Sequence, residues 1–386
     1  MTALDEDTPG VRRAWGWVEH LRRGGTTPWR DWSVQGPARG RVLPGAQQLE
    51  LLRRVNLAVA SSAAPSAAPS AALVERIVTA SAPGRGRPDL ELDGAVERLR
   101  FGPAPVDPAD LATHELIRVA TGLLAEDLVV AGTPERPAAP WARPWRTRYR
   151  LAGDPVLTEP LRAGLAARGR PPGGRGIVLV LGTDVGRMLT DVWTTRCFAG
   201  GARAWSDWLS PHVRHNTLPP RADPVRCARA WADLVGPDRV HVVLDPALAP
   251  RLLGVRRPVP VHPEVSADGA ELARRVGSVL GLLVVPPRRR ALLRETLRPQ
   301  LAELGGVPLV VPPEHHEWLH LRGARLRDAL LRAGYAVHGD PDALLTVDRV
   351  GAPAPSDDGV LELALRLLLD HDRTGPTGLV LGKEGK

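Results

Sequence analysis

The stretch "PEHHEWLHLRG", residues 313–323, contains the side chains whose spacing most directly suggests chemistry. His316 and His320 are four residues apart and Glu317 follows the first, which is the pattern by which a helix offers zinc two imidazoles and a general base. Two prolines directly precede the motif, and proline belongs at a helix start, so His316 is expected in the first turn of a helix. Zinc peptidases instead carry this motif well inside a helix.

A third zinc ligand is also missing at any predictive spacing. The longer metzincin pattern fails because Leu326 stands where its third histidine should be, and no glutamate occurs between Glu317 and Glu362. The flanks favour a structural helix with an apolar stripe, and a zinc hydrolase remains one alternative. The predicted stripe comprises Trp318, Leu319, Leu326, Leu330 and Leu331.

Short β-branched runs alternate with helical patterns in the second half of the chain, and these are the elements that would position a site. A strand is indicated at about residue 149, before "GDPVLT", and further runs lie at 176–182, 239–245, 280–287 and 307–313. Buried apolar runs between helices predict an α/β fold with a mostly parallel sheet flanked by helices. Ligands of such sheets usually lie beyond the carboxyl ends of the strands.

The first part of the chain is predicted to be mainly helical. Residues 11–60 have helical periodicity, with Leu49, Leu51, Leu52 and Leu57 on one face. An Ala/Pro/Ser loop follows at 61–72. The stretch 107–132 then predicts an amphipathic helix.

Cap residues and proline-rich stretches suggest where these elements end. Asp110 could cap the helix within 107–132, and Gly132 could close it. A Pro-rich segment from 132 to 145 indicates a boundary. We therefore divide the chain into residues 1–145, an α/β domain at 146–350, and a C-terminal helix and tail at 351–386.

Composition narrows the classes of function. The 386 residues carry a formal charge of +8, but Lys383 and Lys386 are the only lysines, so 49 of the 51 basic residues are arginine. Arginines alternate with acids through most of the chain, which is typical of solvated helix faces, and the densest basic run is 288–290. Few aromatic residues and no fold-specific motif accompany this charge, so nucleic-acid binding is not expected.

The remaining features favour a protein of the cytoplasm. Cys197 and Cys227 are the only cysteines, which argues against a disulfide framework or a thiolate metal cluster. The acidic start "MTALDEDTPG" lacks the apolar core of a secretory signal, and the longest apolar stretch, 276–287, is shorter than the roughly 20 residues of a membrane span.

Three stretches resemble the sulfotransferase-like P-loop proteins. They are "RGIVLVLGTDVGRMLTDVWTTRCFAGGARAWSDWLSPHV", "DPVRCARAWADLVGPDRVHVVLDP" and "VPLVVPPEHHEWLHLRGARLRDALLRAGYAVHGDPDALL". The resemblance covers about residues 176–345. It implies a P-loop-like fold and a transferase that moves a sulfuryl group from 3'-phosphoadenosine 5'-phosphosulfate to a hydroxyl or amine.

That chemistry needs a Gly-rich turn that opens a helix, whose free N–H groups hold the 5'-phosphate, and a lysine for the bridging oxygen. The usual "PKSGTT" form is absent, since no lysine precedes Lys383. The best positional candidate is "GDPVLT", where Gly153 and Thr158 would contact the phosphate and Asp154 would repel it.

The family's arginine for the 3'-phosphate falls on Thr183 in "GTDVGR", and Arg187 one helical turn on could replace it. Independently of the family, Thr183 or Asp184 can cap the next helix, or the helix start can hold an anion with Arg187 beside it. The predicted cofactor-binding residues are therefore Gly153, Thr158, Thr183, Asp184 and Arg187, with no metal site.

The absence of lysine before Lys383 favours a degenerate nucleotide site. The protein would then be a non-catalytic binding or assembly partner in cell-envelope or glycan modification. An active sulfotransferase that uses 3'-phosphoadenosine 5'-phosphosulfate is the alternative. The candidate ligands are a nucleotide or a glycan, and a protein partner is also open. The early tryptophans (Trp15, Trp17, Trp29 and Trp32) and the later pair (Trp141 and Trp145) are expected to fill small cores more than to stack on sugars.

Overall fold

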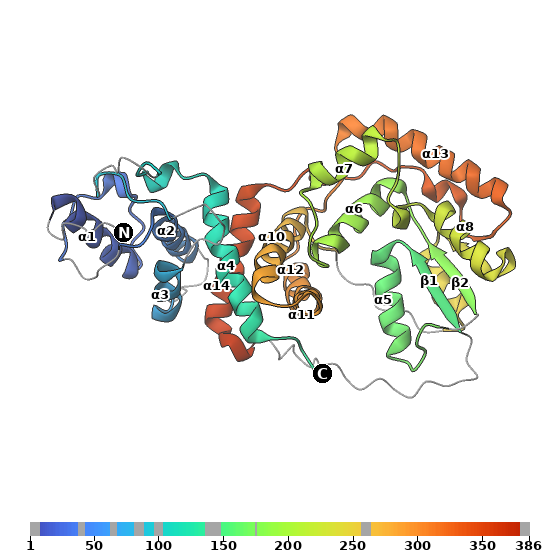
Figure 1. The fold of residues 1–386 in the computed structure, drawn as a ribbon, viewed down its shortest axis with the longest axis horizontal. Coiled ribbons are helices and arrows are strands. Elements are labelled where there is room, and N and C mark those ends of the chain that lie inside the picture. The colour runs from blue at the N-terminus through green and yellow to red at the C-terminus, as the bar shows by residue number, and fades with distance from the viewer. Residues whose placement is uncertain are drawn as a thin grey trace. The chain divides into compact units, whose positions relative to one another are not determined.

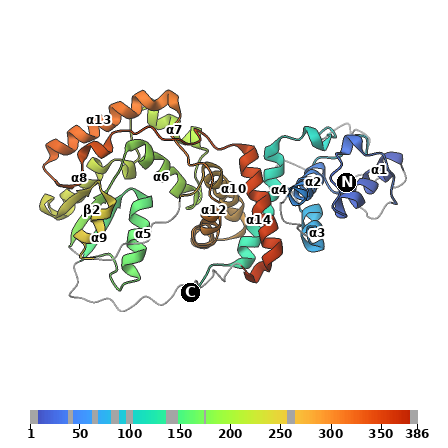
Figure 2. The same ribbon diagram turned by 180° about the vertical axis from the view of Figure 1, so that it is seen from behind.

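The computed structural model describes residues 8–37, 43–61, 68–80, 89–95, 103–135, 148–173, 176–255 and 264–378. The chain forms two compact units, whose elements are labelled in Figures 1 and 2. Unit 1 comprises Met1–Pro134, Arg275–Gln300 and Ser356–Lys386, and unit 2 comprises Glu135–Arg274 and Leu301–Pro355.

The units are not continuous in sequence, unlike the division that we drew near residues 145 and 350. Residues 275–300 and 356–386 group with the first 134 residues, because their helices pack there. For example, the Thr296 hydroxyl donates to the Gly132 carbonyl at 2.7 Å. Such contacts join residues far apart in the chain, and no local pattern signals them.

Unit 1 is helical. Its helices are α1 (Pro9–Arg22), α2 (Ala46–Ala60), α3 (Ala71–Thr79), α4 (Thr113–Ala131), α11 (Pro286–Ala291) and α14 (Asp357–Gly378). Two helices cross the boundary between the units: α10 (Ala267–Leu283) divides after residue 274, and α12 (Arg298–Leu304) divides after residue 300. A π-helical stretch, Leu292–Leu297, joins α11 to α12.

Three details differ from the sequence prediction for this unit. Asp110 does not cap α4, which begins at Thr113, because Asp110 ends a separate 3-10 turn. Leu57 is 37% exposed, although Leu49, Leu51 and Leu52 of the same helix are buried. The Ala/Pro/Ser loop stops before α3, which begins at Ala71 with Ser70 as its N-cap, and residues 62–67 lie outside the described residues.

Two other predictions are confirmed. Gly132 closes α4 with a φ of 71°, a conformation that suits glycine. Trp15, Trp17 and Trp29 are core residues: all three are buried, and Trp17 Nε1 donates to the Thr27 carbonyl at 2.9 Å. Trp32 is half-buried and stacks on a histidine ring, whereas Trp141 and Trp145 lie outside the described residues.

Helix α14 completes unit 1. It packs along α4, its neighbour in Figure 1, and is fixed by polar contacts near both ends. Asp358 accepts from the Thr113 hydroxyl at 3.0 Å, and Asp372 accepts from the Ser70 backbone N–H at 2.9 Å. The predicted C-terminal helix is confirmed, and it belongs to the fold of the first helices.

Unit 2 contains a four-stranded parallel sheet in the order β1–β2–β3–β4. Its strands are Tyr149–Gly153, Ile177–Leu181, Val240–Val243 and Ala336–His338. The predicted parallel sheet and the strands at 149, 176–182 and 239–245 are confirmed. The other two runs are not strands: 280–287 contains the end of α10 and the start of α11, and 307–313 contributes only an isolated bridge at Leu309.

Helices cover both faces of this sheet. Unit 2 contains α5 (Pro155–Ala166), α6 (Val185–Cys197), α7 (Trp205–Arg214), α8 (Pro224–Val235), α9 (Ala249–Leu252) and α13 (His316–Ala333). Alternate residues of a strand point to opposite faces. Val178 and Val180 accordingly pack in a core with α6, α7, α8 and α13, while Leu179 and Leu181 pack in a second core with α5 and α9.

An aspartate follows the carboxyl end of every strand of the sheet and caps the next helical turn. These residues are Asp154, Asp184, Asp245 and Asp340. The chain leaves β1 toward α5 on one face and leaves β2 toward α6 on the other. A sheet opens a crevice where neighbouring connections diverge in this way, and ligands of α/β proteins bind there.

Candidate functional site

Gly153 and Asp154 shape the β1 side of this crevice. Gly153 has a φ of +90°, and a Cβ placed on it would lie 2.1 Å from the Leu181 carbonyl oxygen. Only glycine fits there. The sharp turn points Asp154 inward, where it is fully buried and its Oδ1 accepts from the Val156 N–H at 2.9 Å.

Asp184 and Arg187 occupy the β2 side, at the start of α6. Asp184 Oδ1 accepts from the Arg187 N–H at 2.9 Å, which makes Asp184 the N-cap, as predicted. One turn further on, the Arg187 side chain faces Asp191, with 3.4 Å between Nε and Oδ2. Burial raises the pKa of Asp184 above its ordinary value.

Asp154 and Asp191 form a buried carboxyl pair across the crevice. Burial, and then the charge of Asp191, raise the pKa of Asp154 well above its ordinary value. Burial raises the pKa of Asp191 to about 6, against the attraction of Arg187. Among the described residues no donor reaches Asp154 Oδ2, so this oxygen is satisfied if it carries the proton and donates to Asp191.

This pair predicts that stability falls as the pH rises. The ordinary pKa of such a carboxyl is 3.8, which we take for the unfolded chain. A carboxyl whose pKa is raised in the folded state contributes its full stabilisation below pH 3.8. This contribution is lost as the pH rises through the folded-state pKa, which is about 6 for Asp191 and well above 3.8 for Asp154. Asp154→Asn is expected to raise stability at pH 8 relative to wild type, because an amide mimics the protonated carboxyl. Urea unfolding at pH 5 and pH 8 measures this effect.

The matched control is Asp245→Asn, which changes a post-strand cap of the same kind that is exposed. It is expected to leave the difference between pH 5 and pH 8 as in wild type. A wild-type protein equally stable at both pH values would contradict the shared-proton interpretation, as would an Asp154→Asn variant that is less stable than wild type at pH 8.

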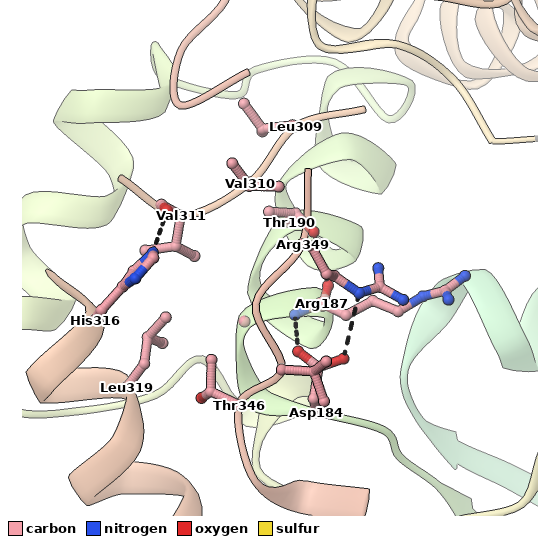
Figure 3. A pocket seen from close by; sticks show the side chains of 12 residues that line it. Asp184, Arg187, Thr190, Leu309, Val310, Val311, His316, Leu319, Thr346 and Arg349 are labelled. Carbon is pink, nitrogen blue, oxygen red and sulfur yellow. Dashed lines mark hydrogen bonds and ion pairs between the residues drawn. The ribbon is translucent and has the colours of Figure 1, made fainter. Parts of the chain in front are cut away.

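A pocket opens beside this network (Figure 3). It is lined by Asp184, Gly186, Arg187, Thr190, Leu309, Val310, Val311, His316, Leu319, Thr346, Val347 and Arg349. In Figure 3, Asp184, Arg187 and Arg349 lie on one side and Val311, His316 and Leu319 on the other. The space between these walls is about 360 Å³ when the open solvent at the mouth is included, and charged side chains face an apolar wall across it.

Two polar groups of the pocket are only partly satisfied by the protein. Arg349 Nε lies 3.8 Å from Asp184 Oδ2, and among the described residues its terminal nitrogens have no further partner. Thr346 Oγ1 is buried without a hydrogen-bond partner in the same part of the chain. A buried hydroxyl and a half-exposed guanidinium can both donate to a bound oxyanion.

The structure brings some predicted site residues together. Asp184 and Arg187 line the pocket, and Thr183 precedes the cap without lining it. Gly153 and Thr158 do not line the pocket. Thr158 is buried inside α5, where its hydroxyl approaches the Pro155 carbonyl at 3.5 Å. Asp154 also lies outside the pocket lining, but it interacts with Asp191, which in turn pairs with Arg187 of the pocket.

Sequence reasoning missed Asp191, Thr346 and Arg349. Asp191 follows Arg187 by four residues, a spacing that predicts an ion pair on a helix and could have indicated it. Thr346 and Arg349 lie in the irregular stretch before α14, more than 150 positions from Arg187. No local signal distinguishes this arginine from the other 48.

The histidine motif forms the start of α13. His316 Nε2 lies 3.2 Å from the Val311 carbonyl oxygen, and His320 is exposed. In the ranges that the structure describes, no three His, Cys, Asp or Glu side chains are grouped to hold a metal ion. Leu319, Leu326 and Leu330 of the predicted stripe are buried, but Leu331 is exposed and lies on the solvent side of the helix.

Comparison with protein-family models, curated proteins and solved structures found no match. In the described ranges, no helix combines the length and the apolar character that crossing a membrane requires.

Proposed function

We propose that this protein acts in the cytoplasm by binding rather than by catalysis. In this proposal, unit 2 is a sulfotransferase-like domain with a degenerate nucleotide site, and it serves as a binding or assembly partner in cell-envelope or glycan modification. Its pocket at the start of α6 recognises an anionic group.

The observation that carries this proposal is the position of two aspartates. Asp154 and Asp184 accept backbone N–H groups at the starts of α5 and α6, where a nucleotide phosphate would need those donors. These side chains already occupy the donors, and the charge of the Asp184 carboxylate repels a phosphate with several negative charges. No lysine before Lys383 could neutralise the charge of a transferred group.

The charge balance of the pocket indicates the class of ligand. If Asp154 is protonated, the carboxylates of Asp184 and Asp191 balance the guanidiniums of Arg187 and Arg349, and Glu264 adds a negative charge from outside the pocket lining. The pocket then has little net charge. A singly charged group, such as a sulfate ester or a carboxylate on a glycan, fits this balance better than a nucleotide with several phosphates.

Arg187→Ala tests this site. A sulfated disaccharide is expected to raise the thermal stability of the wild type by the equivalent of about 2.7 kcal/mol at 100 times its dissociation constant. The variant is expected to lose this shift, because it lacks a guanidinium that can donate to the oxyanion. A thermal-shift titration of both proteins gives the comparison.

The control is Arg325→Ala, which removes an exposed arginine of α13 outside the pocket. It should keep the full shift. No shift of the wild type with sulfated or carboxylated sugars would contradict anion recognition at this pocket.

An active sulfotransferase is the second candidate, because Arg187 lies in the first turn of α6, after the end of β2, near the position where the resemblance implies a 3'-phosphate contact. The discriminating ligand is 3'-phosphoadenosine 5'-phosphate. A saturable shift with this nucleotide that Arg187→Ala abolishes would favour sulfuryl transfer over the binding role.

A further inference from the structure

Among the described residues of unit 1, the turn between α10 and α11 gathers several exposed large aliphatic side chains. Residues 281–290, "GLLVVPPRRR", leave α10 at Leu283 and enter α11 at Pro286. Proline can begin a helix but cannot continue one, so the two prolines end α10 and start α11 in the same few residues.

Large aliphatic side chains face solvent on this turn. Leu282 is 78% exposed, Leu283 49% and Val285 65%. Leu280, Leu292 and Leu293 on either side are buried, so the helices contribute to the core and the turn does not. Adjacent exposed aliphatic side chains of this size often mark a surface that contacts another molecule or a membrane.

The end of α4 adds a fourth aliphatic residue. Arg288 Nη2 donates to the Val129 carbonyl oxygen at 3.4 Å, which holds the turn against the last residues of α4. Val130, the next residue, is 68% exposed. We call Val130, Leu282, Leu283 and Val285 the apolar tip.

The turn between α10 and α11 carries basic residues and no acidic ones. Between Glu271 and Glu295 the chain has six arginines and no aspartate or glutamate. Arg274 and Arg275 pair with carboxylates away from the turn. Arg288 and Arg290 are exposed, and within the described ranges neither forms an ion pair.

We propose that the apolar tip and Arg288–Arg290 form a docking surface for an anionic phospholipid membrane. The aliphatic side chains enter the boundary between headgroups and acyl chains, and the arginines contact lipid phosphates. Aliphatic residues beside arginines fit this partner better than a nucleic acid, which needs stacking side chains or a groove reader. The surface lies in unit 1 and does not depend on the pocket of unit 2.

The test is co-sedimentation of the full chain with vesicles. Pure phosphatidylcholine vesicles are compared with vesicles of phosphatidylcholine and phosphatidylglycerol in equal parts. We expect binding to the mixed vesicles that weakens as salt is raised, and little binding to the neutral ones. Arg288→Glu with Arg290→Glu is expected to lower the partition coefficient at least about thirtyfold, since each arginine near an anionic surface contributes about 1 kcal/mol.

A second variant separates the apolar contribution from the charge. Leu282→Ser with Leu283→Ser is expected to lower binding at least about tenfold while the salt dependence stays. The matched controls are Leu234→Ser, an exposed leucine of α8, and Arg325→Glu, an exposed arginine of α13. Both controls should bind mixed vesicles as the wild type does, and circular dichroism should show that all variants fold.

Three results would overturn the proposal. They are absence of wild-type binding to mixed vesicles, equal loss of binding in the tip and control variants, and wild-type self-association that Leu282→Ser with Leu283→Ser abolishes. The last would identify the tip as a contact between copies of the chain.

Discussion

Gly153→Ala is expected to lower the free energy of unfolding of unit 2 by about 2 to 5 kcal/mol. The left-handed backbone of this residue costs a non-glycine residue about 1–2 kcal/mol, and overpacking costs about 1–3 kcal/mol more. The overpacking arises because the new Cβ would lie 2.1 Å from the Leu181 carbonyl oxygen. Urea unfolding followed by tryptophan fluorescence measures this change.

Gly236→Ala is the matched control. Gly236 has the same φ of +90°, but a Cβ there would meet no atom within 4 Å. It should therefore cost only the backbone contribution, about 1–2 kcal/mol. If both substitutions cost the same, the close approach of β1 to Leu181 would not constrain the fold, and the position of Asp154 would need another explanation.

Trp193→Ala is expected to cost about 3–5 kcal/mol of stability. The indole of α6 is fully buried and packs on Trp205 with 5.4 Å between ring centroids. Its Nε1 also donates to the Arg203 carbonyl at 3.0 Å. The substitution leaves a cavity in the larger core and a carbonyl without its donor. Thermal or urea unfolding of the variant quantifies the loss.

Trp231→Ala serves as the comparison, because this indole of α8 is only half-buried. The Arg150 guanidinium lies over its ring, with 5.2 Å between Cζ and the ring centroid. We expect a loss of about 1–2 kcal/mol, from partial burial and a weak cation–π contact. Similar losses in both variants would argue against the core position of Trp193.

The parallel sheet and one side of the site could be predicted because their signals are local. The runs around Val178 and Val240 are short, apolar and bounded by helical patterns, which is what a buried parallel strand requires. Asp184 stands directly before the first turn of a helix, and this is sufficient to predict an N-cap.

The run at 280–287 has the same composition as a buried strand and was wrongly predicted to be one. Val284 and Val285 are β-branched, but the chain is still helical at Leu283 and turns at the prolines. Periodicity alone cannot separate a short apolar run in a strand from the end of a helix. Here the surrounding helices decide the conformation.

Two polar residues of the pocket could not be predicted because their positions depend on tertiary folding. Arg349 and Thr346 come from an irregular stretch whose place beside α6 is set by the packing of α13 against the sheet. An arginine in such a stretch has no pattern of its own, in a chain with 49 of them. The nucleotide role of Gly153 and Thr158 stays a prediction, and the titration with nucleotide tests it.

The discontinuity of unit 1 affects how the protein is made. A ribosome releases the first 134 residues long before it completes α14, which packs along α4 and holds Ser70 and Thr113. At a synthesis rate of about 5–20 residues per second, the delay between residue 134 and the end of α14 is roughly 12 to 49 s. During that time the apolar side of α4 lacks its native cover, which exposes the first helices to aggregation. The last segment of unit 2 ends at Pro355, so unit 2 can fold before unit 1 is complete.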